Sequence, residues 1–258
     1  MNPRALAAIL PAGPLGVLAG LLLSSGCLPV PTVVGRPAAV VPRDVGSSVV
    51  ECFGGALLSI QSKDIEAGDR ETLTLPGVHG GAIWGLGHGT DVSFAINNEI
   101  QGAVILRQQV LGRPEGYDPP GGRRGPAVDA SLEAGLGGTW LIDALLTDVH
   151  LGVNVSFPCP RVTPYVSYRH HWVSHPVWTD DNGYEIDKYR QEMIWLGFDF
   201  PRVGVVGGRA AVEVFYGWPH RPQRHEIANE YWNWGVNFIL RERGMVSARR
   251  DPWTAGSW

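Results

Sequence analysis

In the stretch LLTDVHLGVNVSF, residues 145–157, polar and apolar residues alternate strictly over the last nine positions. From Val149 onward the odd positions are all apolar, and the even positions carry polar or small residues such as His150 and Asn154. Successive side chains of a β-strand point to opposite faces of the sheet. A period of two therefore predicts a strand with one apolar face and one polar face.

The same alternation recurs along most of the chain. It predicts further strands over residues 49–60, 78–86, 91–97, 101–110, 128–136, 162–173, 189–200, 209–218 and 231–240. The pattern over 49–60 is weak and also fits a helical turn or a plug. Segments rich in polar residues or glycine, at 61–76, 111–126, 137–140, 179–187 and 219–230, are expected to be loops and turns. The expected fold class is all-β, with about ten strands.

Two all-β architectures fit this alternation. A soluble β-sandwich buries the apolar faces, whereas an antiparallel up-and-down transmembrane β-barrel turns them to lipid and fills its lumen with the polar faces. The two differ most in where they place the charged residues and histidines of the polar faces. These residues are Asp129, Glu133, Asp148, His150, Arg169, His171, Arg209 and Glu213.

Two features favour the barrel. Aromatic residues crowd the predicted strand ends, where they would form girdles at the membrane interfaces. They are Tyr165, Trp172, Trp178, Tyr189, Trp218, Tyr231 and Trp232. The polar faces also carry small residues, including Gly152 and Ser167, as a narrow lumen requires. We therefore predict a transmembrane barrel of about ten strands, with the soluble β-sandwich as the alternative.

Composition and charge narrow the possible partners. The chain has 258 residues, which suits a single large β domain. Its net charge of −4 gives no basic surface for nucleic acid, so no nucleic-acid partner is expected. The expected partner is membrane lipid, and the sequence identifies no protein partner.

The N-terminus is typical of a targeting segment. Arg4 precedes the apolar run Ala5–Leu23, which ends at small residues and Cys27. The run LLLSSGC resembles a bacterial lipobox, which implies that Cys27 carries lipid and begins the mature chain. Ordinary signal cleavage and a short membrane anchor are the alternatives. The predicted organisation is a signal peptide over 1–26, a Pro-rich tether over 27–47, the barrel over 48–240 and a tail over 241–258.

Cysteine spacing gives no metal motif. If Cys27 is lipidated, Cys52 and Cys159 remain, and they either form a disulfide or stay unpaired. The chain has no CxxC motif and no cluster of cysteine and histidine that suggests zinc. We therefore expect no metal site and no cofactor.

Taken together, the strands over 49–240 and the export signal resemble the outer-membrane β-barrel proteins of Gram-negative bacteria. The resemblance implies a location in the outer membrane, and residue 28, which is leucine, favours sorting of a lipoprotein there. An even strand number puts both chain ends in the periplasm. Segments 61–76, 179–187 and 219–230 then face outward, and 87–90, 158–161 and 201–208 are inner turns. The long segment 111–126 falls on the periplasmic side, against the usual rule.

The densest group of reactive side chains lies between Tyr168 and His175. It faintly resembles the strand of lipid A deacylase barrels that carries a histidine and a serine two residues later. Here His171 and Ser174 are three residues apart, which puts them on opposite faces of a regular strand. His175, with the acidic residues at 180 and 181, is similar to an omptin-like protease rim. His171, Ser174 and His175 are therefore weak catalytic candidates, and an enzyme is not the main expectation.

The charges on the polar faces are mixed in sign, so they can pair and plug the lumen. We expect an outer-membrane β-barrel lipoprotein with a structural, binding or small-pore, porin-like role in the cell envelope. The alternatives are a barrel hydrolase acting on envelope lipid or protein, and a lipid-tethered periplasmic β-sandwich that acts as a binding module.

Overall fold

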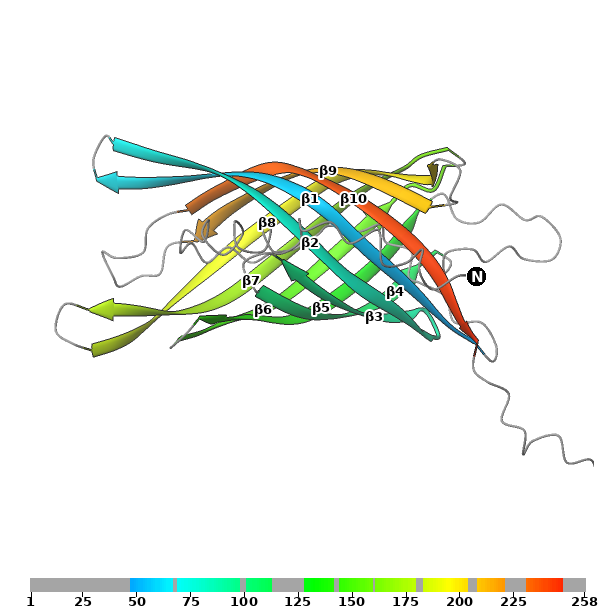
Figure 1. Cartoon of the computed structure of the whole chain (residues 1–258), viewed down its shortest axis with the longest axis horizontal. Helices are drawn as coiled ribbons and strands as arrows, with labels where there is room; N and C mark the ends of the chain where they lie inside the picture. The colour runs from blue at the N-terminus through cyan, green and yellow to red at the C-terminus, as the bar shows by residue number, and fades with distance from the viewer. Residues whose placement is uncertain are drawn as a thin grey trace, which may run out of the picture.

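The structure, a computed structural model, is a closed barrel of ten antiparallel strands (Figure 1). It describes residues 47–66, 69–97, 101–112, 128–141, 144–159, 161–179, 183–203, 208–220 and 231–247. The predicted signal peptide, Cys27 and most of the tether lie outside these residues. Each strand has a hydrogen-bonded neighbour on both sides, so the predicted barrel is confirmed and the β-sandwich is wrong.

The strands follow one another around the barrel in chain order, and the last pairs with the first. They are β1 Ser47–Glu66, β2 Asp69–Gly87, β3 Thr90–Asn97, β4 Gln101–Leu111, β5 Asp129–Leu141, β6 Ala144–Ser156, β7 Thr163–Thr179, β8 Gly183–Val203, β9 Gly208–His220 and β10 Tyr231–Ser247. Among the described residues, no helix is long and apolar enough to cross a membrane.

The alternation predicted from the sequence sets which side of each strand faces out. On β5 and β6, Leu132, Leu136 and Leu151 are 52%, 65% and 52% exposed, whereas Glu133 and His150 are buried. On the other strands too, most of the large apolar side chains that the structure describes are exposed on the outer surface, and the buried polar ones lie inside. The barrel is therefore apolar outside and largely polar inside.

The interior is filled by side chains. Trp195 and Met193 of β8 pack with Phe215 of β9 inside the barrel, and Leu57 of β1 packs against this cluster. Ile83 of β2 is also fully buried. These apolar groups lie among the polar ones, so the barrel has a packed core of mixed character.

Several strands extend beyond the predicted boundaries. The segments 61–76 and 179–187, expected as loops, are mostly the continuations of β1, β2, β7 and β8, and 137–140 belongs to β5. β10 continues past 240 to Ser247, and 49–60 is full strand, so a helical turn or plug there is wrong. Strand pairing uses the backbone, which pairs equally well where the side chains are polar throughout.

The two ends of the barrel differ. In Figure 1 the β1–β2 and β7–β8 hairpins reach furthest at the left end, while the start of β1 and the end of β10 lie together at the right. The turn from Gly87 to Thr90 is at the right end, and its tightness depends on positive φ at Gly87 (91°), His88 (53°) and Gly89 (73°). β4 ends beside this turn, where Gln109 N donates to Gly89 O, so the start of segment 111–126 is at the expected end of the barrel, and residues 113–127 lie outside those described.

Candidate functional site

The polar interior is ordered by the strand register. In the strand register, Asp91 of β3 lies opposite Arg107 of β4, and Arg107 lies opposite Glu133 of β5. Glu133 pairs with Gly152 of β6, which pairs with Arg169 of β7. Inward charges of alternating sign therefore lie at one level of the barrel wall on neighbouring strands.

The first ion pair in this row joins β3 and β4. Arg107 Nη2 lies 2.6 Å from Asp91 Oδ2, and Arg107 Nε donates to Asp91 Oδ1 at 3.3 Å. The two side chains are 1% and 0% exposed. The guanidinium thus meets the carboxylate with two donors, which is the geometry that gives arginine pairs their specificity.

The second ion pair joins β5 to β7 across Gly152 of the intervening strand β6. Arg169 Nε donates to Glu133 Oε1, and Asn154 Nδ2 donates to Glu133 Oε2 at 2.9 Å. The Arg169 guanidinium carbon lies 4.8 Å from the ring centroid of Trp195, a cation–π contact. A Cβ at Gly152 would lie 2.7 Å from Glu133 Oε1, so the glycine is what leaves room for this pair.

A hydrogen-bonded chain joins four strands on the other side of the interior. His79 Nε2 lies 2.6 Å from Asn237 Oδ1, and Asn237 Nδ2 donates to Glu213 Oε2 at 2.9 Å. Tyr165 completes the chain by donating its hydroxyl to Glu213 Oε1. Its ring lies over Gly197 of β8, where a Cβ would lie 2.2 Å from the ring.

Tyr165, predicted as part of an aromatic girdle on the outer surface, does not lie there. It is 2% exposed and lies inside the barrel, whereas Trp172 is 39% exposed on the outer surface. Trp218 is half-buried at the outward positions of β9. The other predicted girdle residues, Trp178, Tyr189, Tyr231 and Trp232, have side chains outside the described set. The girdle prediction was wrong for Tyr165 because it relied on residue type and ignored which of the alternating positions of the strand point inward.

A third charged group gathers around Asp199 of β8. Arg209 Nη2 donates to Asp199 Oδ2, and Arg241 Nη1 lies 3.5 Å from Asp199 Oδ1. Asp199 is fully buried, and Arg241 is 6% exposed. Two arginines from neighbouring strands therefore share one buried carboxylate.

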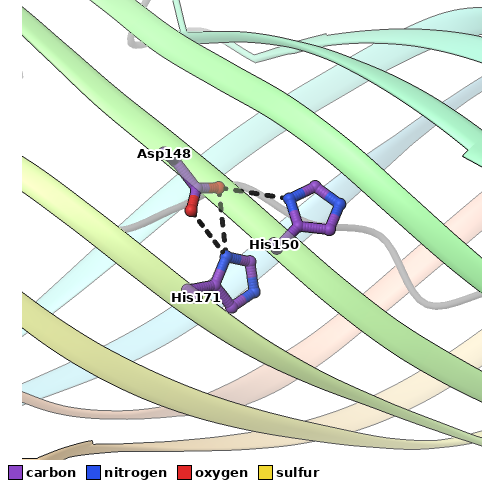
Figure 2. A group of neighbouring side chains, drawn as sticks. All are labelled: Asp148, His150 and His171. Carbon is purple, nitrogen blue, oxygen red and sulfur yellow. Dashed lines mark hydrogen bonds and ion pairs between the residues drawn. The ribbon is translucent and has the colours of Figure 1, made fainter.

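Asp148, His150 and His171 form the most compact group of metal-ligating side chains among the described residues (Figure 2). Asp148 and His150 lie two positions apart on β6, and His171 is the cross-strand partner of His150 on β7. His171 Nδ1 is 3.0 Å from both Asp148 oxygens, and His150 Nδ1 is 3.4 Å from Asp148 Oδ2. The two imidazole rings lie 5.0 Å apart with a 41° tilt.

All eight charged or histidine side chains predicted to face the lumen lie inside the barrel. Asp129, Glu133, Asp148, His150, Arg169, His171 and Glu213 are at most 6% exposed, and the Arg209 side chain is 15% exposed. The predicted set lacks other interior polar groups. Among the described residues they include Glu51, His79, Asp91, Arg107, Asp199, Asn237 and Arg241. Most of these residues occupy the inward positions of the predicted strands, so the alternation could have identified them. Arg241 lies in the segment predicted as tail.

The weak catalytic candidates are not brought together. His171 is buried inside, whereas Ser174 is half-buried at an outward position of β7. The side chain of His175 and the acidic residues 180 and 181 lie outside the described set. Within the described part of the chain, His171 and Ser174 therefore do not form a nucleophile–base pair. Cys52 and Cys159 are both exposed and are not joined in a disulfide.

No protein-family model matches the chain, and no curated protein sequence matches it. Solved structures with a similar fold include Neisserial surface protein A (NspA), at 10% identity and a TM-score of 0.37, covering 76% of this chain and 96% of that one. The outer membrane protease OmpT from Escherichia coli gives 7% identity and a TM-score of 0.35, covering 77% and 96%. Ail, the attachment invasion locus protein of Yersinia pestis, gives 8% and 0.32, covering 77% and 100%. These likenesses concern the outer-membrane barrel type of fold and carry no argument about activity or ligands.

Proposed function

We propose that this protein spans the outer membrane of a Gram-negative cell as a barrel with a closed interior, and that its role in the envelope is structural or binding. The observation that carries the proposal is the pairing of buried charges inside a barrel whose outer surface is apolar. An open, porin-like channel is the opposite arrangement, because its lumen charges stand in water.

The outer surface supports a membrane location. Large apolar side chains such as Leu136, Phe198 and Leu240 are 65%, 52% and 53% exposed, and they recur on neighbouring strands around the barrel. Contiguous apolar surface of this extent is unfavourable in water and favourable against lipid. A closed barrel also satisfies its backbone hydrogen bonds internally, as the hydrocarbon core requires.

The interior supports a closed lumen. Arg107, Arg169 and Asp199 are at most 1% exposed although they carry charge, and each has a partner of opposite sign on another strand. Apolar groups, including Trp195 and Phe215, fill space between them. Because these interior side chains are out of contact with water, no continuous water-filled path runs through the part of the barrel that they occupy.

The lipid anchor belongs to the same proposal. The LLLSSGC run supports acylation of Cys27 after removal of residues 1–26, and the leucine that follows supports retention in the outer membrane. The mass of the N-terminal peptide of purified protein tests this part separately. Such an anchor would hold the start of the chain at the same membrane that the barrel crosses.

Conductance in planar bilayers tests the closed barrel. The full chain is purified in detergent, its folding is checked by a change of gel migration on boiling, and it is then added to bilayers beside a known porin. We expect folded protein that inserts but gives no large, stable conductance. Stable conductance comparable to that of the porin would overturn the closed-lumen proposal, and a protein that folds without detergent or lipid would overturn the membrane location.

A further inference from the structure

We propose that Asp148, His150 and His171 bind a divalent transition-metal ion of the zinc class inside the barrel. From the sequence we expected no metal site, because the cysteines and histidines show no familiar metal-binding spacing. The site becomes visible only when β6 and β7 are side by side. The proposal does not depend on whether the lumen conducts.

The donor set suits zinc. Two imidazoles and one carboxylate supply nitrogen and oxygen ligands, and three protein ligands leave a fourth position for water or another group. One ligand atom from each of the three residues lies within 4.8 Å of the others. Tetrahedral zinc with bonds of about 2.0–2.2 Å holds its ligand atoms about 3.3 Å apart. The observed separations of 3.0 Å and 3.4 Å between the histidine Nδ1 atoms and the Asp148 oxygens are close to this value.

The second observation is that the site is not satisfied by the protein alone. His150 is fully buried, yet neither of its ring nitrogens has a hydrogen-bond partner among the described residues. Its Nδ1 is aimed at the Asp148 carboxylate but at 3.4 Å, beyond the usual N–H···O distance of about 2.7–3.2 Å. A buried polar atom without a partner is costly, and a cation between this nitrogen and the carboxylate would remove that cost.

The surrounding wall fixes the geometry. Gly135 of β5 is the cross-strand partner of His150, and a Cβ there would lie 2.2 Å from the imidazole ring. Gln191 of β8 is the cross-strand partner of His171, and its buried Oε1 has no hydrogen-bond partner among the described residues. Strands hold ligands more rigidly than loops do, so the three side chains have few alternative positions.

Zinc binding is tested on the full chain without a polyhistidine tag, folded in detergent after removal of metal. Bound zinc is measured by mass spectrometry of the metal and by competition with a coloured chelator. We expect about one equivalent per barrel in the wild type and a fall of at least about 10-fold in affinity for Asp148→Asn, His150→Gln and His171→Gln. The matched controls are His170→Gln, which changes the adjacent outward-facing histidine, and His79→Gln, which changes another buried histidine. Both should bind as the wild type does.

The wild type alone gives an independent readout if the site variants fail to fold. Cobalt replaces zinc in such sites, and its visible spectrum distinguishes four-coordinate ligation by nitrogen and oxygen from hydrated, surface-bound ion. A four-coordinate spectrum supports the site. Folded wild type that binds no zinc would overturn the proposal. So would a hydrated cobalt spectrum, or zinc binding that His171→Gln and His170→Gln reduce equally.

Discussion

The outward and inward faces of the same strands obey different rules. On the outer face, Val149, Leu151 and Val153 are exposed, and if this face meets lipid as proposed they need only be apolar, because lipid contacts any apolar side chain equally well. On the inner face, Glu133 needs Arg169 and Asn154 in particular positions, and Gly152 has to stay small. One side of the barrel wall is therefore specified by the class of residue and the other by individual partners.

The largest effect should follow loss of an inner partner. Arg169→Ala leaves Glu133 buried without its arginine, and we expect the free energy of unfolding to fall by about 3–5 kcal/mol. Urea unfolding in detergent or lipid measures it. The control is the Arg169→Ala, Glu133→Gln double variant, which removes both charges and should recover part of the loss. A single variant that loses less than about 1 kcal/mol would mean that the pair is solvated.

A charge on the outer face should have a somewhat smaller effect. Val153 lies outward on β6, three residues before the strand ends at Ser156, so Val153→Arg should cost up to about 2–4 kcal/mol, the penalty for a cation on the lipid face, which is largest at the bilayer midplane and falls toward the interfaces. Val153→Leu is the matched control and should stay within about 1 kcal/mol of the wild type. The same unfolding measurement in lipid compares them. If arginine is tolerated as well as leucine, this face does not contact hydrocarbon.

The smallest of the three effects concerns steric room inside. Gly197→Ala places a Cβ against the Tyr165 ring and should cost about 1–3 kcal/mol, because the ring has to move away from Glu213. Gly54→Ala is the control, since the nearest atom to a Cβ there is 3.8 Å away, and it should change stability by less than about 0.5 kcal/mol. Equal results for the two glycines would show that Tyr165 repacks freely.

The outer face was predictable from the sequence because alternation alone determines it. Strict alternation over 149–157 assigned Val149, Leu151, Val153 and Val155 to the outward face of β6, and the same reasoning predicted a strand at each of the ten positions. The alternation of positions along the strands also assigned Asp148, His150 and His171 to the interior. The strand ends were less predictable, because the polar hairpin of β1 and β2 continues by backbone pairing that leaves no side-chain pattern.

The inner partnerships were not predictable, because they depend on register and on closure. His150 lies beside His171 only because of the pairing offset between β6 and β7, which the connection after Ser156 sets. Tyr165 reaches Glu213 across β8 only because Gly197 lies between them. The bond between His79 and Asn237 further requires β1 to lie between β2 and β10, which alternation along one strand cannot reveal.

The seam between β1 and β10 has a consequence for how the barrel folds. It joins the two ends of the barrel sequence, pairing Ser47 with Ser247 at one end and Lys63 with Tyr231 at the other. Bringing together residues so distant in sequence costs more loop-closure entropy than forming any of the hairpins. The seam therefore forms slowly compared with the hairpins. Until they form, β1 and β10 each present an unpaired edge that can join a strand from another copy. Closure therefore has to outpace encounter between chains, and the barrel folds productively only where the concentration of unclosed chains stays low.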